Sequence, residues 1–289
     1  MQFDGIYVPI VTPFDAHGEV DVPKLETLIE AMVGKGVAGI AACGTTGEYY
    51  ALKDAERSLV LKTVRRVAGT RVQLIAGVSD LSTRRAIERA AEAAELGYDC
   101  LLLSPPPYSL PNQDGIRAHF EYAATHCKLP IIIYNFPART GVNVEFDTVA
   151  ALAKHPQIVG IKESSGNFSQ ALRMLQAGLA DFEVICGCDD QPVDFFFWGS
   201  HAWIAGAGNV FPSEQVALYA AAKAGNWDAA RAMMRHLYPA LHSMEAGDYN
   251  QKAKAGCVNG TLDVGKVRLP LAPLDAAARE AFRKLVRSL

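Results

Sequence analysis

Lys162 is the residue whose position best suits covalent chemistry. It closes the apolar run Ile158–Lys162, which we interpret as a buried strand. Burial disfavours the charged ammonium, and a neutral amine can attack a ketone to form a Schiff base. The alternative is a lysine that has reached a surface loop, the commoner case because lysine is rarely buried.

Tyr134 and Arg139 follow the preceding apolar run, Pro130–Tyr134. The phenol of Tyr134 could serve as a general acid and base. Arg139 stands in a loop that contains Pro137 and offers a planar fork of donors to a carboxylate. The alternatives are a rim aromatic of the core for Tyr134 and a surface ion pair for Arg139.

Two further apolar runs end in loops that could bind a ligand. Val37–Cys43 is followed by Gly44-Thr45-Thr46-Gly47, where glycines allow close approach to the backbone and hydroxyls could hold a carboxylate or relay a proton. Cys100–Leu103 is followed by Ser104 and three prolines that stiffen the loop before Tyr108. The alternatives are an ordinary turn for the first loop and a packing aromatic for Tyr108.

These residues stand at the ends of short, continuously apolar runs, which are typical of parallel strands buried on both faces. Longer amphipathic segments that we interpret as helices separate the runs. Eight strand–helix units predict an α/β fold of the (β/α)8 TIM barrel type, in which chemistry sits at the carboxyl ends of the strands. The expected strand ends are Thr12, Cys43, Gly77, Leu103, Tyr134, Lys162, Gly187 and Ala205.

Helix signals in the intervening segments agree with this fold. Asp21, Ser82 and Asn167 each precede an amphipathic segment in the position of an N-cap. A doubly wound sheet could show the same alternation, but it usually carries a glycine fingerprint after its first strand. Thr12-Pro13-Phe14-Asp15 contains none, which favours the barrel.

No strand signal recurs after about Gly225. We expect a catalytic barrel over residues 1–224 and a C-terminal helical appendage over 225–289, packed on the barrel. The expected helices of this appendage are Asn226–Glu245, Asp248–Asn259 and Asp275–Leu289.

Composition excludes several classes of protein. The chain has 289 residues, 50% hydrophobic and 20% charged, which indicates a large globular fold rather than disorder. A net charge of −3 speaks against nucleic acid as a partner, and no apolar run is long enough to cross a membrane. The N-terminus lacks a signal peptide, and the six cysteines lie mostly in apolar segments, so we expect a cytoplasmic protein with reduced thiols. The seven histidines form no short-spaced metal motif, so we expect no metal.

Three motifs resemble those of the dihydrodipicolinate synthase / N-acetylneuraminate lyase family. They are Gly-Thr-Thr-Gly-Glu at 44–48, Tyr-Asn-Phe-Pro-Ala-Arg-Thr-Gly at 134–141 and Gly-Ile-Lys-Glu-Ser at 160–164, and the resemblance runs from Gly5 to about residue 273. It implies a lyase of the class I aldolase type, in which Lys162 forms an imine with pyruvate or another 2-keto acid. No cofactor would be required. Tyr134 would be the proton shuttle, and Thr45 and Thr46 would bind the keto acid's carboxylate.

The same resemblance implies contributions from other strand ends and from a second subunit. Thr46 would link Tyr134 to Tyr108, and Tyr108 would reach into the site of a neighbouring subunit. A homo-oligomer, either a dimer or a tetramer, is therefore expected. The backbones of Gly187 and Ile204 would line the site.

Two features favour the synthase branch, which condenses pyruvate with aspartate semialdehyde. Arg139 matches the arginine that holds the second substrate's carboxylate in the synthases, whereas the sialic-acid lyases lack it and usually have serine at the position of Thr45. Two differences depart from the synthase pattern: Trp203 stands in the eighth expected strand, and Cys188 replaces an acidic residue. The altered eighth strand end would suit another branch of the family. The alternative is therefore an aldolase, dehydratase or deaminase of the same family, acting on a sugar-acid, sialic-acid or hydroxyproline-derived 2-keto acid. The non-enzymatic alternative is a barrel that binds a keto acid without turnover.

The positions of the lysine-inhibitor site of regulated synthases carry other residue types here, so we expect that lysine does not inhibit. These positions hold Tyr50, Asp54, Arg57, Leu81, Arg85 and Pro107.

Overall fold

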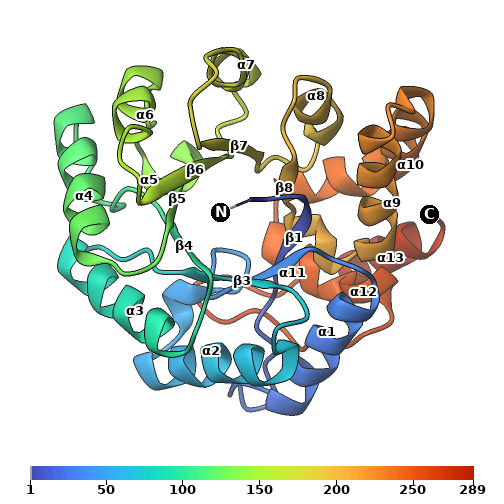
Figure 1. Ribbon diagram of the computed structural model, residues 1–289. Coiled ribbons are helices and arrows are strands. Elements are labelled where there is room, and N and C mark those ends of the chain that lie inside the picture. The colour runs from blue at the N-terminus through green and yellow to red at the C-terminus, as the bar shows by residue number, and fades with distance from the viewer. Residues whose placement is uncertain (1) are drawn as a thin grey trace. The chain divides into compact units, whose positions relative to one another are not determined.

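The computed structural model describes residues 2–289 and contains a closed barrel in which eight strands follow one another in chain order (Figure 1). Neighbouring strands such as β5 and β6 pair in parallel. This confirms the (β/α)8 barrel predicted from the eight apolar runs. The strands are β1 Gly5–Pro9, β2 Gly39–Ala42, β3 Gln73–Gly77, β4 Cys100–Leu103, β5 Ile131–Asn135, β6 Ile158–Glu163, β7 Glu183–Cys186 and β8 Ala202–Ile204.

Helices alternate with the strands and then continue to the C-terminus. Two short 3-10 turns, η1 Tyr49–Ala51 and η2 Gly206–Asn209, follow β2 and β8. The helices are α1 Val22–Gly34, α2 Asp54–Ala68, α3 Thr83–Glu95, α4 Gln113–His126, α5 Pro137–Thr140, α6 Phe146–Leu152, α7 Phe168–Gln176, α8 Pro192–Phe197, α9 Pro212–Lys223, α10 Trp227–Glu245, α11 Tyr249–Ala255, α12 Cys257–Gly260 and α13 Ala276–Arg287.

The strands are apolar on both faces because both faces are covered. Every residue of β5 and β6 is buried, including the polar residues at their carboxyl ends. Between β5 and β6 the register places Tyr134 opposite Lys162 and Asn135 opposite Glu163. The apolar runs therefore bring polar side chains together at the ends of neighbouring strands.

The chain divides into two compact units. The first contains Leu74–Ile204 with the N-terminal residues up to Asp4, and the second contains Gly5–Gln73 with Ala205–Leu289. In the first unit, α3, α4 and α6 lie one beside the next outside β4 and β5 (Figure 1). The domain boundary expected after residue 224 stays a prediction.

The three residues predicted at N-cap positions lie at the N-termini of helices. Asp21 and Asn167 accept hydrogen bonds from the backbone N–H groups of Lys24 and Gln170, at 3.1 and 3.2 Å. Ser82 occupies the N-cap position of α3, although its side chain makes no capping hydrogen bond. Within residues 2–289, no helix combines the length and apolarity needed to span a membrane.

The helix expected over 248–259 is shorter than predicted and is followed by a separate turn. Helix α11 ends at Ala255, and Gly256 separates it from α12. Within α12, Val258 and Asn259 have φ angles of +37° and +54°, which a continuous right-handed helix does not permit.

The buried His119 should make the free energy of unfolding depend on pH. Its Nδ1 lies 2.8 Å from Thr83 Oγ1, while its buried Nε2 has no hydrogen-bond partner among residues 2–289. Burial lowers the pKa of His119 from 6.5 to about 4. The unfolded chain therefore binds more protons than the folded chain between these values, and stability falls as the pH falls through this window.

We expect this histidine to cost about 3 kcal/mol of unfolding free energy between pH 7 and pH 4. Urea unfolding at both pH values measures the loss, and His119→Gln, which does not titrate, should lose less stability than the wild type. Equal losses in the two proteins would contradict the prediction.

Candidate active site

Lys162 is a buried amine beside an aromatic ring. Its side chain lies at the end of β6 and the residue is only 5% exposed. Its Nζ lies 4.3 Å from the centre of the Tyr134 ring, which comes from the opposite register position on β5. No carboxylate among residues 2–289 lies within ion-pair distance of this amine. The surface-loop alternative therefore does not describe Lys162.

A buried hydrogen-bond network joins the residues that follow Tyr134 and Lys162. Asn135 Nδ2 donates to Glu163 Oε2 at 2.8 Å, and the Ser165 N–H donates to Glu163 Oε1 at 2.7 Å. The Asn135 side-chain oxygen accepts from the Val144 N–H at 2.9 Å. The network fixes the ends of β5 and β6 against each other, and with them the phenol and the amine.

Gly187 provides room for the Lys162 side chain. A Cβ atom at this position would lie 2.9 Å from Lys162 Cγ and 2.0 Å from Ser164 Oγ, so a larger residue would displace one or both. The Ser164 hydroxyl is buried and has no hydrogen-bond partner within the described chain. The structure thus gives a steric reason for a glycine at the end of β7.

The eighth strand contributes buried residues to the first unit. Ile204 is fully buried in β8, and so is its neighbour Trp203. The indole Nε1 of Trp203 donates to Asp189 Oδ1 at 3.2 Å, which satisfies the indole N–H. The tryptophan is therefore part of the packing around the β7 and β8 ends.

Arg139 presents its guanidinium near the ring of Phe136. It is exposed on α5, and its Cζ lies 5.8 Å from the centre of the Phe136 ring. The same ring stacks on Tyr134 with a centroid separation of 5.6 Å. Across residues 2–289 no acidic side chain pairs with Arg139, so the surface ion-pair alternative is not found.

The Tyr108 side chain is almost fully exposed. It is 92% exposed and has a φ of +73°, a left-handed conformation that is unusual for an aromatic residue. Leu110 in the same loop also has a positive φ and is 58% exposed. The packing-aromatic alternative therefore does not hold within the chain.

The threonine loop, residues 44–48, lies in the second unit. Cys43, which precedes the loop, and Glu48, which ends it, both have a φ of +55°. Thr12 Oγ1 donates to the Gly47 carbonyl at 2.7 Å, and Asn250 Nδ2 donates to the Thr45 carbonyl at 3.1 Å.

The hydroxyls of the threonine loop form no hydrogen bond within the described chain. Thr46 is 7% exposed and Thr45 is half-buried. The ordinary-turn alternative stays open for this loop.

The two units therefore supply different chemical groups. The first supplies an amine, a phenol and a guanidinium, and the second supplies two hydroxyls. Over residues 2–289, no three His, Cys, Asp or Glu side chains gather where they could hold a metal ion.

Sequence reasoning missed the supporting residues of both units. Asn135 and Glu163 each follow a candidate reactive residue directly, which is the signal that could have identified them. Lys254, which pairs with Glu48 in the second unit, lies far from every motif and gave no such signal.

Comparisons with known proteins give a consistent picture. The model of the dihydrodipicolinate synthetase family matches residues 2–289. A 4-hydroxy-tetrahydrodipicolinate synthase of Geotalea daltonii is 39% identical over 288 residues, covering 99% of this chain and 98% of that protein. The enzyme of the same name from Methanoculleus marisnigri is 37% identical over 290 residues and covers 99% of both chains.

Solved structures show the same fold. Dihydrodipicolinate synthase from Aquifex aeolicus superposes with a TM-score of 0.94 at 32% identity, over 99% of this chain and 98% of that one. The chloride-inhibited enzyme from Acinetobacter baumannii, solved in complex with pyruvate, gives a TM-score of 0.91 at 33% identity, with the same coverage of 99% and 98%.

Proposed function

Because this chain belongs to the dihydrodipicolinate synthetase family, we propose that it is a Schiff-base-forming lyase that condenses pyruvate with aspartate semialdehyde. The observation that carries the proposal is the buried Lys162 amine, which has no carboxylate partner in the described chain and lies over the Tyr134 ring. Relatives named 4-hydroxy-tetrahydrodipicolinate synthase, aligned over almost the whole chain, support the choice of reaction.

The first chemical step is attack of Lys162 Nζ on the keto carbon of pyruvate. The carbonyl oxygen leaves as water and a carbon–nitrogen double bond forms, which makes the imine. The protonated imine withdraws electrons, so the methyl carbon of pyruvate can lose a proton and become an enamine. The enamine then forms a carbon–carbon bond to the aldehyde carbon. The imine acts as the electron sink, so no metal or organic cofactor enters the proposal.

The hydroxyl groups move protons and bind the carboxylate in this proposal. Tyr134 serves as the general acid and base next to the imine nitrogen, where general acid–base catalysis contributes about 10²- to 10⁴-fold. By family resemblance we assign Thr45 and Thr46 to the pyruvate carboxylate. We assign Tyr108 to the proton path of a neighbouring subunit, and its exposure supports this. A cytoplasmic homodimer or homotetramer is part of the same proposal.

Reductive trapping tests the covalent step. The protein is treated with borohydride in the presence of pyruvate, digested and analysed by mass spectrometry. The expected result is a single pyruvate adduct on Lys162, absent when either pyruvate or borohydride is omitted. An adduct on another lysine, or none, would end the proposal.

Arg139 should determine binding of the second substrate. We expect Arg139→Met to raise the KM for aspartate semialdehyde about 10- to 100-fold, the range for loss of a charge-assisted hydrogen bond. Steady-state kinetics with each substrate varied in turn measures the effect. Arg173→Met is the control, because Arg173 is also exposed and lies over an aromatic ring, Phe146. A matching rise in the KM for pyruvate would contradict this role.

The eighth strand supports a second candidate within the family. Trp203 is fully buried and its indole donates to Asp189, so a residue type that differs from the synthase pattern is built into this strand end. Such a strand end would suit an enzyme that acts on a sugar-acid or hydroxyproline-derived 2-keto acid. A turnover assay with pyruvate plus aldehydes, and with a panel of such keto acids, separates the two candidates. Binding without turnover across the whole panel would instead support the non-enzymatic alternative.

A further inference from the structure

Helix α11 contacts the threonine loop at two points, Thr45 and Glu48. We propose that Lys254 and Asn250, one turn apart on this helix, are positioning residues that hold Thr45 and Thr46 in the conformation that binds the keto acid's carboxylate. The inference rests on the proposed function for the identity of the ligand. The contact between α11 and the loop lies wholly within the second unit.

The first contact is a buried ion pair at the end of the loop. Lys254 Nζ lies 2.6 Å from Glu48 Oε1, and the two side chains are 2% and 0% exposed. Glu48 Oε2 also accepts the Arg268 backbone N–H at 2.8 Å. Because Glu48 is left-handed, with a φ of +55°, these partners hold a backbone conformation that glutamate does not favour.

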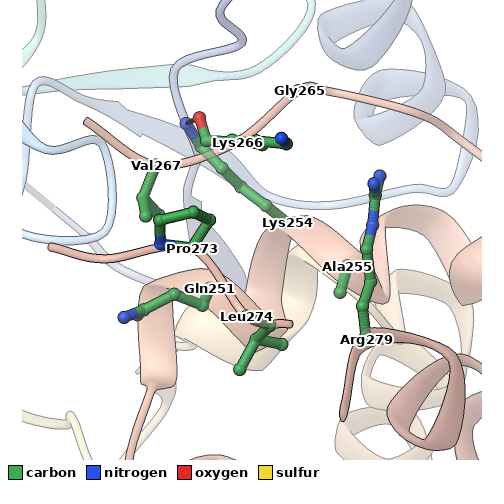
Figure 2. Close-up of a pocket in the computed structure, with 9 residues that line it drawn as sticks. All are labelled: Gln251, Lys254, Ala255, Gly265, Lys266, Val267, Pro273, Leu274 and Arg279. Carbon is green, nitrogen blue, oxygen red and sulfur yellow. Dashed lines mark hydrogen bonds between the residues drawn. The ribbon is translucent and has the colours of Figure 1, made fainter. Parts of the chain in front are cut away.

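Lys254 is itself held from several sides. It donates to the Lys266 carbonyl at 2.9 Å, and its Nζ lies 4.0 Å from the centre of the Phe14 ring. Figure 2 shows Lys254 extending from α11 to the segment that contains Gly265, Lys266 and Val267. The ammonium can therefore hold Glu48 only in a narrow range of positions.

The second contact is to the middle of the loop. Asn250 Nδ2 donates to the Thr45 carbonyl at 3.1 Å and lies 3.1 Å from the Tyr50 hydroxyl. Asn250 and Lys254 are four residues apart, so they share one face of the helix. One rigid element thus fixes the loop backbone on both sides of Thr46.

Stability alone does not account for the pair. A buried ion pair is commonly no more stabilising than apolar residues of the same size, because both charges lose their hydration. Burial lowers the pKa of Lys254 to about 8 in spite of the adjacent Glu48. A conformational role for the threonine loop explains why a charge pair is placed here.

The test compares Lys254→Met with Lys252→Met, its neighbour on α11. The Lys252 ammonium donates to the Ser243 carbonyl and not to a residue of the threonine loop, so its replacement removes a lysine without touching the loop. We expect Lys254→Met to raise the KM for pyruvate at least tenfold. Borohydride trapping at saturating pyruvate should still reach the wild-type extent. Asn250→Leu should shift the same constant in the same direction, and Lys252→Met should not.

Conservative variants and amide exchange keep the test informative if Lys254→Met is unstable. Lys254→Arg keeps the charge, and a cavity of about 30 Å³ beside Lys254 gives the longer side chain some room, so it should recover most of the affinity for pyruvate. Hydrogen exchange of the peptide spanning residues 43–50 should rise in Lys254→Met and stay unchanged in Lys252→Met, at a temperature where both are folded.

The outcomes separate the inference from the proposed function. If Lys254→Met lowers the melting temperature but leaves both the KM for pyruvate and the exchange of residues 43–50 unchanged, Lys254 is only structural and the inference is overturned. If the wild type yields no pyruvate adduct while exchange still rises in Lys254→Met, the proposed function fails but the contact of α11 with the loop stands. A KM that stays high in Lys254→Arg would also count against the role of the charge.

Discussion

Lys162→Arg will abolish reductive trapping of pyruvate and lower turnover by a factor on the order of 10⁴ or more, the scale seen when an enzyme loses its nucleophile. Arginine does not lose its proton in proteins, so it provides no lone pair for attack on a ketone. Its guanidinium carries a positive charge and can lie over the Tyr134 ring, where Lys162 Nζ is 4.3 Å from the ring centre. The variant therefore separates the covalent step from electrostatic attraction of the substrate.

The control for this prediction is Lys154→Arg, since Lys154 is exposed and precedes β6 in the chain. Its turnover and trapping should match the wild type. Circular dichroism and melting curves should show Lys162→Arg folded, because loss of activity through unfolding would carry no information about the amine. Turnover within tenfold of the wild type in a folded Lys162→Arg would refute the imine mechanism.

The fold was predictable because strands that are buried on both faces have a simple sequence pattern. Parallel strands covered by helices are continuously apolar, and each run from Ile6–Val11 to Ala202–Ala205 corresponds to a strand of the barrel. The C-terminal helices were less well bounded. Gly256 and the left-handed Val258 end the helical segment early, and only the tertiary context shows that Val258 adopts such a conformation.

The candidate residues were predictable because strand ends concentrate chemistry in this fold. Tyr134 and Lys162 were identified by their place at the ends of apolar runs, and the register between β5 and β6 brings them together. The roles assigned to the individual site residues stay predictions.

The supporting polar residues were not predictable in the same way. Lys254 lies in a polar helical segment where a lysine ordinarily faces solvent, and its partner Glu48 is more than two hundred positions earlier in the chain. Asn135 and Glu163 pair only because a bulge between Ile131 and Ile132 sets the register of their strands. Such contacts form between residues that are distant in the chain and adjacent in the fold, and local sequence patterns do not predict them.

Tyr134→Phe should lower kcat by about 10²- to 10³-fold while leaving the fold and the binding of pyruvate largely intact. The substitution removes only the hydroxyl, which has no hydrogen-bond partner among residues 2–289. The ring can still stack on Phe136 and still lies beneath Lys162. Because no buried partner is left unsatisfied, the melting temperature should change little. Steady-state kinetics with pyruvate and aspartate semialdehyde, together with the rate of borohydride trapping, measures the effect.

The pattern across these measurements distinguishes proton transfer from packing. Loss of a proton shuttle slows imine formation and enamine formation, so trapping should be slower but should reach the same final extent. A packing role would instead lower the melting temperature and raise the KM for pyruvate. Tyr122→Phe is the matched control, because Tyr122 is an exposed residue of α4 and stacks on His126, another aromatic ring. If Tyr134→Phe retained wild-type kcat, the proton would have to pass through another group, and the assignment of the phenol would be wrong.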